Sequence, residues 1–196
     1  VALPRKDRAL AESQETSRSH KDFVIEADPF LPLEKDLERR DFRCNSLALR
    51  LADGKVIDPF NGQADLERKI IHLTNPGSFP DDPLRVLRAA RFASVLEFDI
   101  DREIYLAAKE IDLSGLSVER VNEELFKILL QSPRPSRGLQ EMLKLTVLKQ
   151  LFPELYRCSL SIQDSYFHPE KDEAGHHTVW AHLLLSVDQA KIISRL

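Results

Sequence analysis

The tripeptide Asn75-Pro76-Gly77 divides the sequence into two parts with different hydrophobic patterns. Before it, leucines alternate in a short run up to Asp53-Gly54, a dipeptide typical of β-hairpin turns, and Val56 and Ile57 continue the pattern beyond the turn. After it, apolar residues recur at helical spacing, and proline, aspartate or serine precedes the runs. The sequence therefore predicts an α+β fold that is mostly α, with a short antiparallel hairpin first and helices to the end.

Several of the expected helices have a recognisable start. Asp81 and Asp82 precede Pro83, so acidic N-cap residues and an early proline open a helix that should run to about Leu96. Asp101 and Ser117 are N-cap candidates for the next two helices. The other expected elements are a weak strand over 1–6, an exposed loop over 7–22, a charged helical segment over 34–40, a helix over 102–110, a helical region over 138–152 and a long amphipathic helix over 173–196.

Composition narrows the class of protein. Hydrophobic residues make up 42% of the 196 residues, which is enough for a core, and no run of about 18 apolar residues predicts a membrane-spanning helix. Cys44 and Cys158 are far apart and form no Cys-x-x-Cys pair, which favours reduced thiols in a cytoplasmic protein. The net charge of −4 argues against a uniformly basic nucleic-acid binder but allows a local positive stripe. Because the chain begins at Val1 without an initiating Met or a signal peptide, we expect it to start part-way into a longer protein.

The helix after Pro83 has an unusual charge pattern. It carries Arg85, Arg88 and Arg91 at a spacing of three and no acidic residue. On periodicity alone, this pattern favours an ordinary capped helix with a solvated basic face. The chemistry of its first turn allows a second interpretation.

Asp82 and Arg85 place a hydrogen-bond acceptor and a forked donor one helical turn apart. Cytosine and adenine each present an amino donor beside a ring-nitrogen acceptor, so a carboxylate can take the amino proton while a guanidinium donates to the ring nitrogen. Uracil and guanine present the reverse order and would place a carbonyl against the carboxylate. The pair could therefore select C and A, and Arg88 and Arg91 would suit a triphosphate.

A second cluster lies at Arg39–Asn45. Its arginines could hold phosphates, Asn45 could bind a sugar hydroxyl and Asp41 could help to bind a metal, although a charged helix end explains the same pattern.

Histidines near the C-terminus form a third cluster. His177 and His182 are five residues apart, which is not the i,i+4 spacing of paired helical ligands. Taken alone, these residues favour solvated or capping histidines over a zinc site.

Four segments occur in an order and at spacings that form a recognisable set of motifs. They are Arg39-Arg40-Asp41-Phe42 with Asn45, Ile57-Asp58-Pro59-Phe60-Asn61-Gly62 with Asp65-Leu66, Asp81-Asp82-Pro83-Leu84-Arg85 through Phe92, and Ser117-Val118-Glu119-Arg120 with Glu123-Glu124. They resemble, in turn, the RRDFxxNA, IDPxxGxxDL and EDPxRxLRAxRF motifs and the later supporting element of the class II tRNA nucleotidyltransferases, the CCA-adding enzymes, and of the related bacterial poly(A) polymerases. The resemblance covers nearly the whole chain.

This resemblance implies the C-terminal half of a polymerase-β-like nucleotidyltransferase head, followed by an α-helical neck and body. We expect a partial head over 1–74, a helical neck with the base-selecting motif over 75–115, a tRNA-binding body over 116–157 and the start of an HD-type helical domain over 158–196. The implied reaction is template-independent transfer of CMP and AMP from CTP and ATP to the 3′ end of tRNA, with release of pyrophosphate.

The same resemblance assigns roles to residues. Asp41 is the expected catalytic residue, and Asp82 and Arg85 are the expected base-reading pair. The expected nucleotide-binding residues are Arg40, Asn45, Asp81, Asp82, Arg85, Arg88 and Arg91. Asp81 stands where the family usually has glutamate, which shortens the reach of that carboxylate.

Two elements of the family are not in the sequence. They are the Gly-Ser-x-x-Arg loop and the metal-binding Asp-x-Asp. Two-metal phosphoryl transfer needs such carboxylates. We therefore expect the Mg²⁺ ligands to lie mostly outside this chain and the chain by itself to be inactive. Residues 120–157 contain seven Lys or Arg and only four Glu. This surplus of positive charge favours the body as the surface that binds tRNA phosphates, and binding should depend steeply on salt concentration. The expected RNA contacts are Arg134, Arg137 and Lys144.

The segment from His168-Pro169-Glu170 to His177-Thr178 is similar to the start of the HD phosphohydrolase domain of one bacterial branch. There His177 would be one ligand of a second divalent metal, whose His-Asp pair is not in the sequence. Three alternatives stay open: a poly(A) polymerase that accepts only ATP, a non-catalytic RNA-binding remnant, and a phosphohydrolase that works through its HD domain. No membrane partner is expected.

Overall fold

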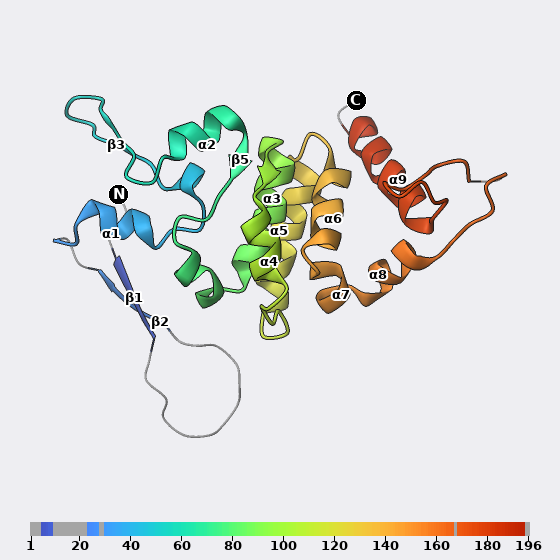
Figure 1. Ribbon diagram of the computed structural model, residues 1–196, viewed down its shortest axis with the longest axis horizontal. Helices are drawn as coiled ribbons and strands as arrows, with labels where there is room; N and C mark the ends of the chain where they lie inside the picture. The colour runs from blue at the N-terminus through green and yellow to red at the C-terminus, as the bar shows by residue number, and fades with distance from the viewer. Residues whose placement is uncertain (1–4, 10–22, 28–29, 167, 195–196) are drawn as a thin grey trace, which may run out of the picture. The chain divides into compact units, whose positions relative to one another are not determined.

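The computed structural model describes residues 5–9, 23–27, 30–166 and 168–194 (Figure 1). These residues divide into two compact units. The first unit contains the residues up to Arg68 together with His72–Asp81, and the second contains Lys69–Ile71 and everything from Asp82 onward. The mostly helical α+β class expected from the sequence is confirmed.

The first unit begins with two paired strands. Strand β1 (Arg5–Ala9) runs antiparallel to β2 (Phe23–Ala27), with Arg5 opposite Ala27 and Ala9 opposite Phe23. The expected loop over 7–22 is therefore wrong for residues 7–9, and residues 1–4 and 10–22 lie outside the described residues. Strand β2 was not expected, although Phe, Val and Ile in its sequence have high strand propensity.

The expected charged helix and hairpin are both confirmed, with shorter bounds. Helix α1 spans Leu33–Glu38, and β3 (Ala48–Leu49) pairs antiparallel with β4 (Val56–Ile57). The connection covers residues 50–55 instead of a two-residue turn, and one further hydrogen bond, from the N–H of Arg50 to the carbonyl of Lys55 at 2.9 Å, extends the pairing. Gly54 takes the left-handed conformation, with φ of 69°, that lets the loop turn.

The Ile57–Gly62 motif turns into helix α2 (Gly62–Arg68). The Asp58 carboxylate accepts hydrogen bonds from the backbone N–H groups of Gly62 and Gln63, at 2.7 and 2.9 Å. Burial works against the charge of this carboxylate, but these hydrogen bonds outweigh it and hold the pKa of Asp58 below its usual value. A Cβ on Gly62 would lie 2.2 Å from the carbonyl oxygen of Arg43, so only glycine allows the two motifs to pack this closely.

The first unit has a small hydrophobic core. This unit also contains the 3₁₀ helices η1 (Arg43–Asn45) and η2 (Pro76–Asp81), and its fully buried side chains include Leu37, Phe42 and Phe79.

The second unit is built around three helices that lie side by side (Figure 1). They are α3 (Leu84–Leu96), α5 (Val118–Gln131) and α6 (Pro135–Lys144). Ala89, Ala90 and Ala93 are fully buried on α3, and small side chains at such positions let neighbouring helices approach closely. A Cβ on Gly138 of α6 would lie 2.4 Å from Ile128 Cγ2. Glycine is therefore required where α6 crosses α5.

The helix starts expected from Asp101 and Ser117 are confirmed, whereas the acidic N-cap expected for α3 is not, because Pro83 occupies the N-cap position and makes no side-chain cap hydrogen bond. Asp101 caps α4 (Arg102–Ala108) by accepting from the N–H of Glu103, and Ser117 caps α5 by accepting from the N–H of Arg120. Between α3 and α4, β6 (Asp99–Ile100) pairs in parallel with β5 (Ile70–Ile71).

The C-terminal helices differ from expectation in their bounds. The region over 138–152 is two helices, α6 and α7 (Val147–Leu151), because Thr146 takes a left-handed conformation with φ of 64°. Helix α8 spans Pro153–Leu160 and packs against α9 (Val179–Ile193). The helix expected over 173–196 begins only at Val179, after a loop in which Gly175 has φ of 84°. No helix in the described ranges combines the length and hydrophobicity that a bilayer crossing requires.

Candidate nucleotide-binding and RNA-binding residues

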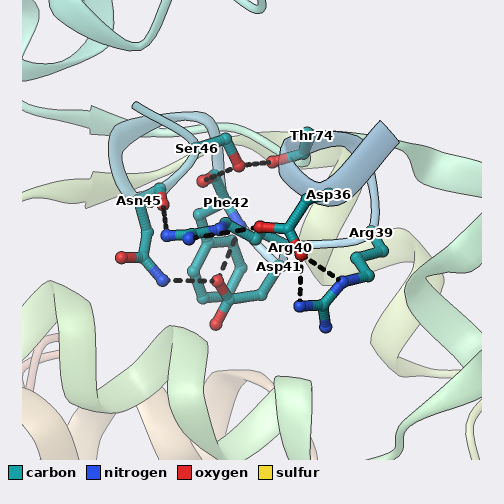
Figure 2. Close-up of polar contacts among 8 residues, drawn as sticks. All are labelled: Asp36, Arg39, Arg40, Asp41, Phe42, Asn45, Ser46 and Thr74. Carbon is teal, nitrogen blue, oxygen red and sulfur yellow. Dashed lines mark hydrogen bonds and ion pairs between the residues drawn. The ribbon is translucent and has the colours of Figure 1, made fainter. Parts of the chain in front are cut away.

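The loop after α1 is fastened to the chain segment 73–74 (Figure 2). Phe42 is fully buried and forms an isolated antiparallel bridge with Leu73. The hydroxyl of Ser46 donates to the carbonyl of Phe42 at 3.0 Å and lies 2.7 Å from the hydroxyl of Thr74. The N–H of Thr74 donates to the carbonyl of Asp41 at 3.1 Å. This network holds the motif loop in one conformation.

Arg40, Asp41 and Asn45 come together as the sequence predicts. Asp41 Oδ1 accepts from the N–H of Phe42 at 3.0 Å and from Asn45 Nδ2 at 3.1 Å, while Arg40 donates to the carbonyl of Asn45 at 3.0 Å (Figure 2). These contacts stabilise the loop itself. The roles of Arg40, Asp41 and Asn45 in binding nucleotide and metal stay predictions.

Sequence reasoning missed Asp36, which supports the same loop. It is buried, pairs with Arg39 at 2.6 Å, and lies 3.6 Å from Arg40 Nη2 (Figure 2). The spacing of Asp36 to Arg39 and Arg40, i to i+3 and i+4, is a signal that could have found it.

No set of three His, Cys, Asp or Glu side chains among the described residues of the first unit lies close enough to share an ion. Mg²⁺ is usually held by one or two carboxylates together with water and substrate phosphates, so Asp41 fits as one ligand of such a site, and this role stays a prediction. Cys44 lies near Asp41 and Asp65, and burial, followed by the charges of these two carboxylates, raises the pKa of its thiol to about 12.

Asp82 is held at the exposed start of α3 by a residue from another helix. Its Oδ1 accepts from the N–H of Leu84 at 3.2 Å, and Nη2 of Arg120 donates to both carboxylate oxygens at 3.0 Å. The Asp82 side chain is 33% exposed. A carboxylate has about four acceptor positions, so Oδ2 of Asp82 keeps capacity for a further donor.

Arg85 lies one turn along from Asp82 on α3 and is half-buried, as is Arg88, whereas Asp81 is exposed at the end of η2. Sequence reasoning placed Arg120 only in a supporting motif and did not identify it as the partner of Asp82. No local pattern could have shown this pair, because its two residues are 38 positions apart.

Arg91 is engaged in a buried ion pair. Its Nε lies 2.6 Å from Oε2 of Glu124, whose side chain is 3% exposed, and its guanidinium carbon lies 4.3 Å from the centre of the Phe92 ring. Lys127 is a second cation for Glu124, at 3.1 Å. The burial of Glu124 could have been predicted from the sequence, because Glu124 falls on the same helical face as Val121 and Ile128, which are buried.

The three residues expected to contact RNA line one pocket of about 350 Å³ in the second unit. Lys171 adds a fourth cation, but the pocket has equally many acidic residues, which are Asp99, Glu141, Asp172 and Glu173. Arg137 is occupied with Asp99 and with the carbonyl of Phe98, both at 2.7 Å. Lys144 lies 3.3 Å from Glu141 and 3.4 Å from Glu173. Arg134 is exposed and forms no salt bridge with another described residue. The pocket is therefore not a uniformly basic surface.

His177, the expected metal ligand, is half-buried, and its Nδ1 lies 3.0 Å from the carbonyl oxygen of His168. The side chains that the structure brings together in this region are instead those of His168, Glu170 and His182. A metal-binding role for His177 stays a prediction.

Comparison with known proteins agrees with the resemblance of the motifs. Residues 5–72 match the poly(A) polymerase head domain, and residues 97–158 match the probable RNA- and SrmB-binding site of polymerase A. The Multifunctional CCA protein of Stenotrophomonas maltophilia strain K279a is 40% identical over 176 residues, which are 86% of this chain and 43% of that protein. The chain belongs to the class II family of CCA-adding enzymes and poly(A) polymerases.

Solved structures of this family are also similar. The Thermotoga maritima CCA-adding enzyme, complexed with tRNA, is 37% identical with a TM-score of 0.56. The match covers 62% of this chain and 31% of the Thermotoga chain. CCA-adding enzyme complexes with ATP and with CTP are each 37% identical with TM-scores of 0.57; they cover 62% and 63% of this chain, and 30% and 31% of their own chains. This class II chain thus spans less than half the length of the relatives it matches.

Proposed function

We propose that this protein takes part in template-independent addition of CMP and AMP, from CTP and ATP, to the 3′ end of tRNA in the cytoplasm. The observation that carries the proposal is the Asp82 carboxylate. It is oriented at the exposed start of α3 by Arg120 and the N–H of Leu84, and it retains acceptor capacity one turn before Arg85.

The chemistry of base selection follows from that carboxylate. An amino group of cytosine or adenine can donate to Asp82 while the Arg85 guanidinium donates to the ring nitrogen. Uracil or guanine would set a carbonyl oxygen against the carboxylate, and leaving such groups unpaired costs about 1–3 kcal/mol, or roughly 5-fold to 140-fold in affinity. Because Arg120 contacts both oxygens of Asp82, it acts as a positioning residue for this step.

The relatives support CCA addition over poly(A) synthesis, because the similar structures are CCA-adding enzymes complexed with CTP as well as ATP. The tRNA complex of the Thermotoga enzyme supports tRNA as the partner. For this chain we propose Arg134 as the leading phosphate contact, since it is exposed and its charge is not used by neighbouring carboxylates of the pocket. Enzymes of this family use a divalent metal, which we propose to be Mg²⁺; no step is assigned to a metal held by the residues described.

Binding of the four nucleoside triphosphates to the full chain, measured by calorimetry, tests the base-reading role. We expect CTP and ATP to bind at least about 5-fold more tightly than UTP and GTP. Asp82→Ala should reduce this difference to less than about 3-fold. Asp82→Asn should improve UTP and GTP binding, because the new amide can donate to their carbonyl groups.

Asp112→Ala is the matched control, because Asp112 also binds a backbone N–H in an exposed turn but lies outside the motifs. It should leave the preference for CTP and ATP intact. Equal binding of all four nucleotides by the unmodified chain, or an unchanged preference in Asp82→Ala, would contradict the proposal. Binding of ATP without CTP would favour the poly(A) polymerase alternative.

A further inference from the structure

Helix α9 and the loop before it contact one face of α6 along its whole length. The two helices pack against each other (Figure 1). Ser136, Gln140 and Lys144 are spaced by four residues and therefore lie on the same face of α6. The C-terminal residues that contact this face are Asp188 at Ser136, Trp180 at Gln140, with 2.8 Å between Nε1 and Oε1, and Glu173 at Lys144, with 3.4 Å between Oε1 and Nζ.

The contact with Asp188 takes the place of a local helix cap. Helix α6 begins at Pro135, and its N-cap residue, Arg134, makes no side-chain cap hydrogen bond. Asp188 instead accepts from the N–H of Ser136 at 2.9 Å and from the hydroxyl of Ser136 at 2.6 Å. The first N–H groups of a helix have no partner within the helix, and a carboxylate beside them also offsets the positive end of the helix dipole. A residue 52 positions along the chain therefore supplies what an N-cap side chain normally supplies.

The turn that Asp188 caps carries two of the residues expected to contact RNA. Arg134 immediately precedes α6, and Arg137 lies in the first turn of the helix. Both line the pocket of about 350 Å³, together with Ser136. Leu184 of α9 lines the same pocket. The pocket is therefore formed jointly by α6 and α9, and the position of its arginines depends on how the start of α6 is held.

We propose that Asp188 is a positioning residue for RNA binding, which fixes the start of α6 so that Arg134 can contact an RNA phosphate. This inference rests on the proposed function of the chain in tRNA binding. Without the cap the first turn of α6 frays, and RNA binding weakens because only molecules with a formed turn bind at full strength. Loss of a capping side chain shifts the equilibrium between formed and frayed turns by about 2-fold to 30-fold.

The sign of the effect distinguishes positioning from simple electrostatics. The Asp188 carboxylate is negative and repels phosphate, so removal of its charge alone should strengthen RNA binding. Removal of its hydrogen bonds should weaken RNA binding. Asp188→Ala removes both the charge and the hydrogen bonds, whereas Asp188→Asn removes the charge but keeps an acceptor for the N–H of Ser136.

Binding of a fluorescently labelled tRNA transcript to the full chain, measured at several salt concentrations, tests the proposal. Asp188→Ala should weaken tRNA binding by at least about 3-fold and lower the slope of log affinity against log salt concentration by up to about 0.7–0.9, the value of one phosphate contact. Asp188→Asn should bind tRNA at least as tightly as the unmodified chain. Far-UV circular dichroism and the fluorescence of Trp180 show whether both variants remain folded.

A double-mutant cycle with Arg134 separates positioning from a general loss of structure. If Asp188 acts through Arg134, Asp188→Ala should weaken tRNA binding by less than about 1.5-fold when it is added to Arg134→Ala. A general loss of structure would weaken binding by the same factor in both backgrounds. Gln189→Ala, at an exposed position of α9 outside the pocket, is the matched control and should bind tRNA within about 2-fold of the unmodified chain.

Three results would overturn the proposal. They are unchanged tRNA binding by Asp188→Ala, binding by Asp188→Asn that is as weak as that of Asp188→Ala, and equal effects of Asp188→Ala with and without Arg134. Absence of tRNA binding by the unmodified chain would contradict the proposed function, and this inference with it.

Discussion

Arg91→Met tests how much the ion pair with Arg91 stabilises the fold by compensating the buried charge of Glu124. Nε of Arg91 is 2.6 Å from Oε2 of a carboxylate whose side chain is 3% exposed. Methionine keeps most of the length and apolar volume of the arginine stem, so loss of the charge is the main change. The variant therefore leaves Glu124 buried with Lys127 as its nearest cation.

The expected loss of stability follows from burial and from the second cation. Removal of one partner from a buried ion pair costs about 3–5 kcal/mol. Lys127 still lies 3.1 Å from Glu124, and solvent reaches Arg91, whose side chain is 16% exposed, so we expect about 2–3 kcal/mol. In the double variant Arg91→Met, Glu124→Met no buried charge remains, so it should lose at least about 1 kcal/mol less than the sum of the two single variants.

Urea unfolding followed by tryptophan fluorescence measures these values. Trp180 is the single tryptophan of the chain, is 1% exposed and lies in the same unit as α3 and α5. Arg102→Met, at an exposed position on α4, is the control and should change stability by less than about 0.5 kcal/mol. A loss below about 1 kcal/mol for Arg91→Met, or simple additivity in the double variant, would refute this reasoning.

Two further predictions concern thiol reactivity and RNA binding. In a Cys158→Ser background, iodoacetamide should alkylate Cys44 roughly 1000-fold more slowly in the folded chain than in denaturant at pH 8.5, because only the thiolate reacts and burial raises the pKa of Cys44 to about 12. The folded-state rate should keep rising above pH 10; a plateau near pH 9 would contradict the buried environment. For tRNA, Arg134→Ala should lower the slope of log affinity against log salt concentration by about 0.7–0.9, the value of one phosphate contact, and Lys149→Ala, outside the pocket, should not. An unchanged slope in Arg134→Ala would exclude this residue as a phosphate contact.

Local signals account for the parts of the fold that sequence analysis predicted correctly. Asp101 and Ser117 mark helix starts because each caps an N–H two or three residues away, and a contact this short can be read directly from the sequence. The pairing of β1 with β2 is not local, since the register joins Ala9 to Phe23 across 13 residues, and sequence analysis missed it. The break at Thr146 was missed for another reason, because a β-branched residue rarely takes a left-handed conformation.

The same distinction applies to the candidate sites. Arg40, Asp41 and Asn45 come from one motif loop, so their proximity could be predicted. The partners of the functional candidates on α3 could not, because Arg120 lies 38 residues after Asp82 and Glu124 lies 33 residues after Arg91. The cluster of His168, Glu170 and His182 was missed because reasoning from helical spacing excludes ligands that come from a loop.

These long-range partners change how the motif residues have to be tested. Asp82 and Arg91 are both expected to contact nucleotide, and both are also held by residues of α5. Substitution of either one alone therefore removes a possible ligand contact and an intramolecular contact together. The double variant of Arg91 and Glu124 separates the two effects, because it removes the unpaired buried carboxylate without restoring a cation. If nucleotide affinity is higher in the double variant than in Arg91→Met, Arg91 acts through the fold; if affinity is equally low in both, Arg91 contacts the triphosphate directly.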